Sequence, residues 1–144
     1  ESRVGEVIIQ TAFPAHPFWQ RLMEGGYPRV AKDALEERRA ANWPPYSRLA
    51  LLRSAATRRN DAHAFLDVAA GFVAGLSHGR LKVLGPVEAP MARRAGRYRA
   101  QLLLQSADRR ALHEVLRELR PMLEADPAAR RVRWSIDVDP VELF

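Results

Sequence analysis

The chain has 144 residues, of which 47% are hydrophobic and 28% are charged, and its formal net charge at pH 7 is +6. This length allows one domain, or one domain with a small addition, and this composition excludes the collagen-like and intrinsically disordered classes. The absence of cysteine excludes disulfides and thiolate metal sites, and without an apolar run of about 18 residues we expect neither a membrane span nor a signal peptide.

Three secondary-structure elements are expected before the adjacent prolines Pro44 and Pro45. The β-branched run from Val4 to Thr11 predicts a short strand. Pro17 suits the first turn of a short helix that the pair Gly25-Gly26 would stop. A second helix is expected from about Arg29 to Ala41, because the residue before a proline avoids the helical region and two prolines follow Trp43.

A domain boundary is predicted at Pro44-Pro45. In residues 1–44, six basic and six acidic side chains cancel, so the whole net charge of +6 belongs to residues 45–144. The first part is near neutral and the second is strongly basic, which indicates two parts with different roles.

Residues 45–144 alternate regularly between strand and helix patterns. One helix, capped by Asn60, is expected to reach about Leu76, and a second is expected to start near Asp108 and to be kinked or ended by Pro121. The expected strands span Tyr46–Ser54, Leu81–Val87, Ala100–Leu104 and Arg131–Val138.

The resulting order, βαββαβ, predicts an α+β fold of the ferredoxin-like class. In that fold an antiparallel four-stranded sheet carries both helices on one face. The third strand alternates, with Ala100 and Leu102 on one side and Arg97, Arg99 and Gln101 on the other. We therefore expect these arginines on the outer face, which is the face of the sheet opposite the helices, or at its edge.

The segment from Arg80 to Gln105 carries most of the positive charge. It holds six basic side chains and one acidic side chain, Glu88, for a net charge of +5. Its two strands are expected to be joined by a basic loop that contains four arginines, Arg93, Arg94, Arg97 and Arg99. Such a patch attracts nucleic acid or acidic peptides, although an ordinary solvated surface in an arginine-rich protein would show the same composition.

The sequence offers no catalytic site. A phosphate-binding loop needs a lysine directly after a glycine, and neither Lys32 nor Lys82 follows one. The string GLSHG at residues 75–79 matches G-x-S-x-G, but here a helix precedes Ser77 and a strand follows it, the reverse of a hydrolase nucleophile. The spacing of the four histidines does not indicate a metal site. We therefore expect that the 144 residues of this chain neither catalyse a reaction nor bind a cofactor.

Four strings together carry a resemblance to a known family. They are similar to the C-terminal end of the bacterial replication-restart DNA helicases called PriA, or primosomal protein N-prime. Because the chain begins at Glu1 rather than methionine, we expect it to be a fragment of such a protein. The strings are GEVIIQT at 5–11, ERR followed by PPY within 37–46, VLGPVEAPMARRAGRYRAQLLLQ at 83–105 and WSIDVDP at 134–140.

The resemblance implies a role in a larger machine. The family consists of ATP-dependent helicases that unwind DNA in the 3′→5′ direction at stalled forks and act with other primosome proteins in the bacterial cytoplasm, at the nucleoid. Residues 1–44 would then be the end of the second RecA-like helicase lobe, and residues 45–144 would be the C-terminal DNA-binding and partner-binding domain. ATP, magnesium and zinc would bind elsewhere in the full-length protein, which is itself an ATP hydrolase.

Two hypotheses for the site follow. In the first, single-stranded or forked DNA binds the basic segment, where Tyr98, or Trp43 outside it, could stack on a base. The DNA-binding residues would be Arg93, Arg94, Arg97, Tyr98 and Arg99. In the second, the domain is a protein-interaction module that docks an acidic peptide or packs on the helicase core, and its contact with DNA is incidental. The resemblance makes Arg109 the candidate that binds the acidic, phenylalanine-ended tail of single-strand DNA-binding protein. A guanidinium suits a terminal carboxylate.

Overall fold

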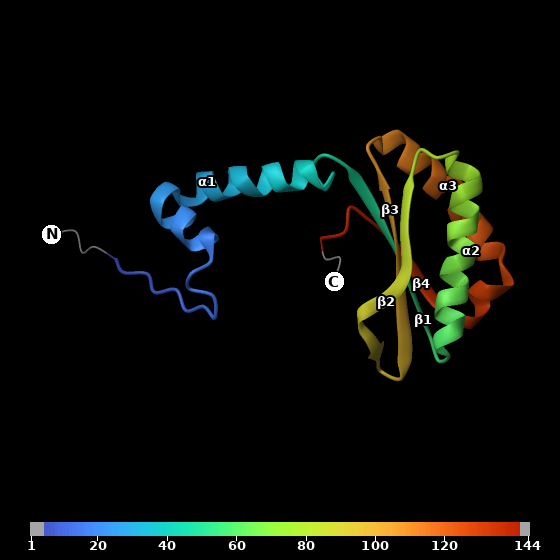
Figure 1. Cartoon of the computed structure of the whole chain (residues 1–144). Coiled ribbons are helices and arrows are strands. Elements are labelled where there is room, and N and C mark those ends of the chain that lie inside the picture. The colour runs from blue at the N-terminus through green and yellow to red at the C-terminus, as the bar shows by residue number, and fades with distance from the viewer. Residues whose placement is uncertain (1–4, 142–144) are drawn as a thin grey trace. The chain divides into compact units, whose positions relative to one another are not determined.

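The computed structural model describes residues 5–141 of the chain. Its contacts separate two compact units, the first ending at Ala41 and the second beginning at Asn42. In Figure 1 the first unit is coloured from blue to teal and the second from teal to red. Each unit is described by itself. Within residues 5–141, no helix combines the length and the apolar character that crossing a bilayer requires.

The first unit is built around one interrupted helix, α1 (Pro17–Ala40). The helix begins where predicted, because the His16 Nδ1 atom accepts a hydrogen bond from the Phe18 amide at 3.2 Å. At Gly26, with φ 64° and ψ −169°, the backbone leaves the helical region, which is the stop predicted from the glycine pair. The two helical segments on either side correspond to the two helices that the sequence predicts.

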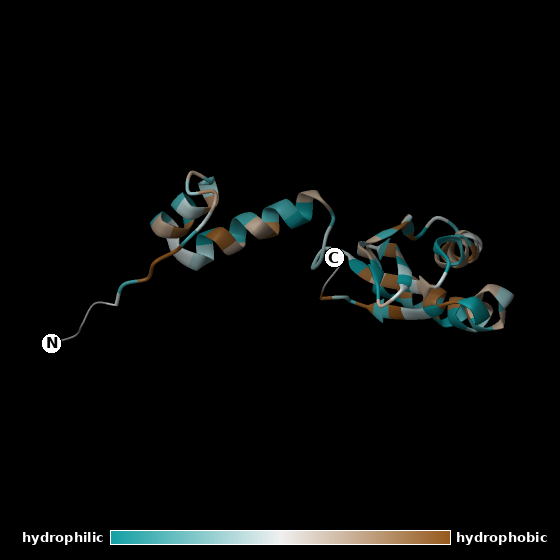
Figure 2. Ribbon diagram, turned by 90° about the horizontal axis from the view of Figure 1, so that it is seen from below, coloured by the Kyte–Doolittle hydropathy of each residue, from teal (hydrophilic) through white to brown (hydrophobic). Residues whose placement is uncertain are grey.

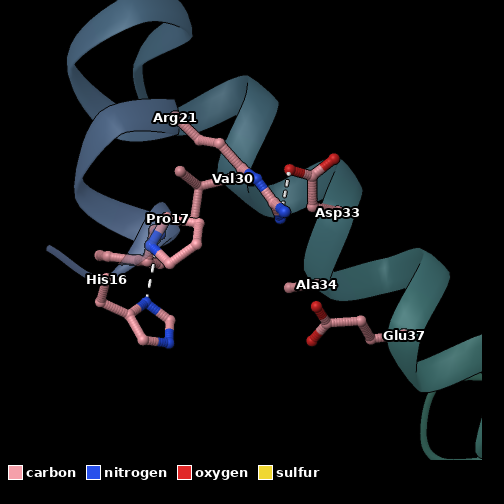
Figure 3. Close-up of a pocket in the computed structure, with 8 residues that line it drawn as sticks. His16, Pro17, Arg21, Val30, Asp33, Ala34 and Glu37 are labelled. Atoms are coloured by element: carbon pink, nitrogen blue, oxygen red, sulfur yellow. Dashed lines mark hydrogen bonds and ion pairs between the residues drawn. The ribbon is translucent and has the colours of Figure 1, made fainter.

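One ion pair crosses the interruption of α1. The Arg21 guanidinium lies 3.2 Å from the Asp33 carboxylate, and both side chains line a hollow of about 490 Å³ within this unit (Figure 3). No residue of α1 is buried. The pair therefore spans the bend in a solvated setting, where its contribution to stability is small.

The prediction of a strand from Val4 to Thr11 is wrong for residues 5–11, which are the part of this range that the structure describes. Residues 5–11 have no strand structure, and Val4 lies outside the described residues. The side chains of Val7 and Ile8 are 86% and 85% exposed. A strand requires a neighbouring strand to satisfy its backbone N–H and C=O groups, and no other strand exists among the described residues of this unit.

The second unit has the predicted βαββαβ order, and its sheet has the strand order β2-β3-β1-β4 with all neighbours antiparallel. Figure 1 shows α2 and α3 on the same side of this sheet. The ferredoxin-like fold is therefore confirmed. Its elements are β1 (Arg48–Ala56), α2 (Arg59–Ser77), β2 (Lys82–Arg94), β3 (Arg97–Ser106), α3 (Arg109–Ala125), the 3-10 helix η1 (Pro127–Arg131) and β4 (Arg133–Val138).

The core lies between the sheet and its two helices. Alternate residues of β3, including Leu102 and Leu104, are fully buried against apolar side chains of α2 and α3. The Phe65 ring of α2 packs on the Trp134 ring of β4 with centroids 5.5 Å apart. Figure 2 shows the strands banded in brown and teal, as expected when one face is buried and the other is polar.

Two helix-boundary predictions are corrected by the structure. Helix α2 starts one residue before Asn60, and its N-cap, Arg58, makes no side-chain capping bond. Helix α3 continues past Pro121 to Ala125, so Pro121 does not end the helix, and a kink at Pro121 stays a prediction. Pro121 and Arg117, whose carbonyl loses its helical hydrogen bond, are both exposed, so water can satisfy that carbonyl.

Part of the outer face is covered. Leu49 and Leu51 of β1 point away from the helices, yet they are only 2% and 1% exposed. Gln105 of β3 lies beside Leu49 in the pairing register, and its side-chain amide donates to the Asn42 carbonyl and to the Ser47 hydroxyl. The segment that enters β1 is therefore anchored at this end of the sheet, and the polar half of the outer face lies at the other end.

Substitution of two leucines on adjacent strands tests the location of the core. We predict that Leu102→Ala lowers the free energy of unfolding by about 2–5 kcal/mol, because it leaves a cavity in the core. Leu84→Ala removes the same atoms from a side chain that is 38% exposed, so its cost should stay below about 1 kcal/mol. Urea unfolding followed by circular dichroism measures both. Equal losses would contradict the described core.

Candidate nucleic-acid interface

The basic segment forms a hairpin, and the prediction of a basic loop is wrong. Strands β2 and β3 continue to a two-residue turn, Ala95-Gly96, in which both residues have positive φ, 49° and 74°. This is the geometry of a tight β-hairpin turn. Because of Pro86 and Pro90, the strand predicted from the sequence ends at Val87, but β2 is an edge strand, where a missing N–H is tolerated. The four arginines therefore lie on strands.

The pairing register divides the five predicted DNA-binding residues between two faces. Arg94 pairs with Arg97, and Arg93 pairs with Tyr98. Since Ala100 of β3 faces the core, alternation places Tyr98 and its partner Arg93 on the helix side and Arg97, with Arg94, on the outer face. Arg99 also lies on the outer face. The structure therefore brings Arg94, Arg97 and Arg99 together and separates them from the other pair.

The Tyr98 ring already has a neighbour. The Arg93 guanidinium carbon lies 5.2 Å from the centroid of this ring, a distance at which a cation is attracted to an aromatic face. Tyr98 is half-buried. Trp43, the other aromatic candidate for stacking, is also half-buried and precedes β1. Neither ring belongs to the arginine group on the outer face.

The outer-face arginines lack a countercharge in their own hairpin. Among residues 5–141, Arg94, Arg97 and Arg99 make no ion pair. The one acidic side chain of the hairpin, Glu88, is paired with Arg59 of α2 on the helix side. The positive charge of the outer face is therefore available to an external anion.

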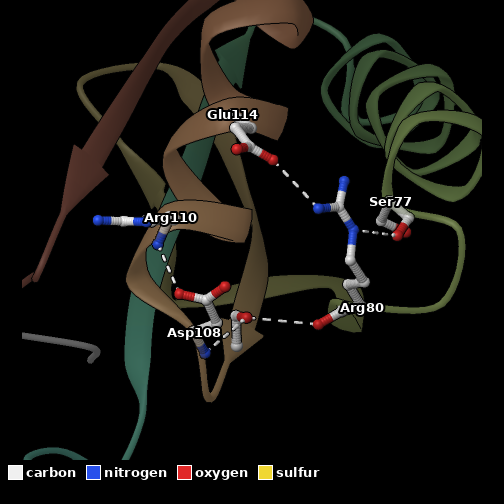
Figure 4. Close-up of polar contacts among 6 residues, drawn as sticks. Ser77, Arg80, Asp108, Arg110 and Glu114 are labelled. Atoms are coloured by element: carbon white, nitrogen blue, oxygen red, sulfur yellow. Dashed lines mark hydrogen bonds and ion pairs between the residues drawn. The ribbon is translucent and has the colours of Figure 1, made fainter.

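Arg80 is the first residue of the basic segment defined in the sequence analysis, and its contacts give it a structural role. Its guanidinium donates to the Ser77 carbonyl at 3.2 Å and lies 3.1 Å from the Glu114 carboxylate, which ties the end of α2 to α3. Its own carbonyl accepts a hydrogen bond from the Ser106 hydroxyl (Figure 4). These contacts connect the start of the hairpin to its end and remove Arg80 from the candidate interface.

Two further arginines lie on the outer face and were not among the predicted site residues. Arg53 of β1 is paired with Asp137 of β4 at 2.7 Å. Arg133 of β4 is exposed, and among the described residues it has no ion pair. In the sequence, Arg133 and Ser135 alternate with Val132, Trp134 and Ile136, and this pattern indicates that Arg133 lies on the side opposite the core. What was missing was the strand order, which brings β4 and β1 beside the hairpin.

The partner-docking candidate Arg109 opens α3. Its Nε atom lies 3.5 Å from the His113 Nε2 atom one turn later, and Asp108 caps the helix by accepting from the Arg110 amide at 2.8 Å. The exposed side of α3 borders a hollow of about 390 Å³ lined by Arg110, His113, Glu114 and Arg117. This surface is basic and lies on a different element from the outer-face arginines.

The structure adds two observations on catalysis. Ser77 is only 2% exposed at the end of α2, so its hydroxyl is not presented at the surface. Among the described residues, no three His, Asp or Glu side chains gather as metal ligands do.

A family model and the curated relatives of this chain agree on one family. The model of the family described as primosomal protein N C-terminal domain matches residues 39–141. The chain is 38% identical over 140 residues to the replication restart protein PriA of Haemophilus influenzae, and 32% identical over 139 residues to that of Synechocystis. These alignments cover 96% of this chain but only 19% and 16% of the two relatives, so the chain spans less than a fifth of their length.

A solved structure supports the fold alone. The designed protein Foldit4 aligns with a TM-score of 0.50 over 67% of this chain and 99% of its own length, with 7% sequence identity. At that identity the likeness carries no information on function.

A glycine fixes the start of the hairpin and can be tested. Gly85 has a φ of +108°, and a Cβ atom there would lie 3.0 Å from the Gln101 carbonyl oxygen of β3. We predict that Gly85→Ala lowers the free energy of unfolding by more than about 1 kcal/mol, because neither the backbone conformation nor the neighbouring strand accommodates the methyl group. Thermal unfolding measures the change.

Gly71 is the matched control, because it lies in α2 with nothing within 4 Å of its position for a Cβ atom. Gly71→Ala should raise the free energy of unfolding by up to about 1 kcal/mol. A tolerated Gly85→Ala variant would show that the hairpin path is wrong.

Proposed function

The chain belongs to the family of primosomal protein N C-terminal domains, and from this premise we propose that it is the DNA-binding and partner-docking end of a bacterial replication-restart helicase. The resemblance read from the four sequence strings points to the same family. In this proposal the motor, with its ATP, magnesium and zinc, lies in the parts of the protein outside this chain. The chain acts at stalled forks in the cytoplasm by binding, without chemistry of its own.

One observation carries the DNA-binding part of the proposal. Arg94, Arg97 and Arg99 lie together on the outer face without an acidic partner among the described residues. Crowded guanidinium groups repel one another, and an external polyanion relieves that repulsion. Their planar forks also bind phosphate oxygens in pairs. Single-stranded or forked DNA supplies such an anion at each nucleotide.

We predict that replacing Arg94 and Arg97 together with glutamine weakens binding of a fluorescein-labelled oligothymidylate by about tenfold, because charge-assisted contacts to phosphate are lost. The plot of log affinity against log salt should become shallower by roughly 0.7 for each contact removed. Fluorescence anisotropy at two salt concentrations measures both quantities.

The control for this prediction is the double variant Arg130→Gln with Arg131→Gln. It removes the same charge from η1, outside the sheet. If the two double variants lose the same affinity, binding follows net charge and the hairpin has no special part in it.

A second candidate function is docking of the acidic tail of single-strand DNA-binding protein. The supporting observation is the basic, hollowed side of α3, with exposed Arg109 and His113 one turn apart. A guanidinium there can take a terminal carboxylate, and the aliphatic parts of the charged side chains that line the hollow can take a phenylalanine ring. Since this surface lies on α3 and the arginine group lies on the sheet, the two functions do not compete for side chains.

For this second function, we predict that Arg109→Ala weakens binding of an acidic peptide that ends in phenylalanine by about tenfold, while oligothymidylate binding changes less than twofold. Isothermal titration of the chain with the peptide measures the effect. Arg130→Ala serves as the matched control. Equal peptide affinities for the two variants would remove Arg109 from the docking site.

A further inference from the structure

The strand order places two arginines on either side of one small residue. Ala55 of β1 pairs with Arg99 of β3 on one side and with Arg133 of β4 on the other. All three point to the outer face, because Ser54, the neighbour of Ala55, faces the helices and donates to the Ala62 carbonyl at 2.7 Å. With neighbouring strands about 4.8 Å apart, the two arginine Cα atoms lie roughly 10 Å from each other across Ala55.

A third arginine is held at the same place. Arg53 lies two residues before Ala55 on the same strand and face, and its guanidinium is fixed by the Asp137 carboxylate at 2.7 Å. The side chains of this pair are 33% and 43% exposed. Asp137 therefore positions Arg53 while leaving it accessible. Arg99 and Arg133 make no ion pair within residues 5–141, so the positive charge of the cluster does not depend on Arg53 alone.

The cluster surrounds a hollow. A depression of about 210 Å³ is lined by all three arginines and by the small side chains of Ala55 and Ser135. Because alanine has only a methyl group, the sheet leaves space between the arginine arms. Arg99 and Arg133 make no ion pair among residues 5–141, so their guanidinium groups can turn toward an anion that enters this space.

The cluster also continues the group described on the hairpin. Arg94 on β2 and Arg97 on β3 lie on the same face, next to Arg99. At this end of the sheet every strand therefore contributes an arginine, in the order β2, β3, β1, β4. A terminal carboxylate or a single small anion would contact one part of this row. A polymer with a negative group in each unit can contact all of it.

We propose that Arg53, Arg99 and Arg133 form a phosphate-binding site for single-stranded DNA, whose backbone crosses the strands from the hairpin to β4. The proposal rests on the DNA-binding function above and extends the interface to β1 and β4. A phosphodiester group occupies the hollow over Ala55, where the guanidinium forks of Arg99 and Arg133 donate to its oxygens. Asp137 acts as a positioning residue that holds Arg53.

Two variants of the whole 144-residue chain test the site by different means. Arg133→Gln removes one guanidinium, and Ala55→Leu fills the hollow while it keeps every charge. Both should weaken binding of labelled oligothymidylate by about tenfold. The control Arg131→Gln removes a charge two residues away, outside the sheet, and should change the affinity less than about twofold. Anisotropy measures binding, and circular dichroism verifies that each variant is folded.

The outcomes separate this inference from the proposed function. If wild-type chain does not bind oligothymidylate, both fail. If it binds and the Arg94 and Arg97 double variant weakens it, but Arg133→Gln and Ala55→Leu behave like Arg131→Gln, only the further site is wrong. Polyglutamate is the second probe: if Arg133→Gln weakens polyglutamate binding as much as DNA binding, the site is not a phosphate site. A loss specific to DNA in both variants supports it.

Discussion

Burial of one face of β3 against α2 and α3 is the constraint on which the rest of the structure depends. Leu102 and Leu104 are fully buried in that contact, and because side chains alternate along a strand, Arg97, Arg99 and Gln101 must occupy the other face. The hydrophobic effect fixes the leucines. The arginines then follow from the pleat, so one packing event places the basic surface without any attraction between the arginines themselves.

Much of the fold could be predicted because its signals are local. Helical spacing in α3 and alternation in β4 appear within a few residues of sequence, and the βαββαβ order follows from them. The two wrong strand predictions have physical causes. Residues 5–11 have strand composition but no pairing strand among the described residues of their unit. The predicted second strand of the hairpin domain ended too early because it contains Pro86 and precedes Pro90, and an edge strand tolerates both prolines.

The candidate site was only half predictable for a related reason. The hairpin arginines are close in sequence, so their charge shows as a cluster. Arg53 and Arg133 are 80 positions apart in numbering and come together beside Ala55 only because β1 pairs with β4. Composition could not show that Arg80 is engaged by Glu114 while Arg133 makes no ion pair among the described residues. Such distinctions depend on tertiary contacts.

The pairing register of β3 links correct folding of the sheet to the presence of the basic surface. A slip of one position against β1 would turn Arg97 and Arg99 inward and expose the leucines to water. Both errors would be costly, and both would erase the basic row at once. A chain with a misassembled sheet therefore could not retain a weakened version of this surface. Competence to bind would serve as a signature of correct assembly.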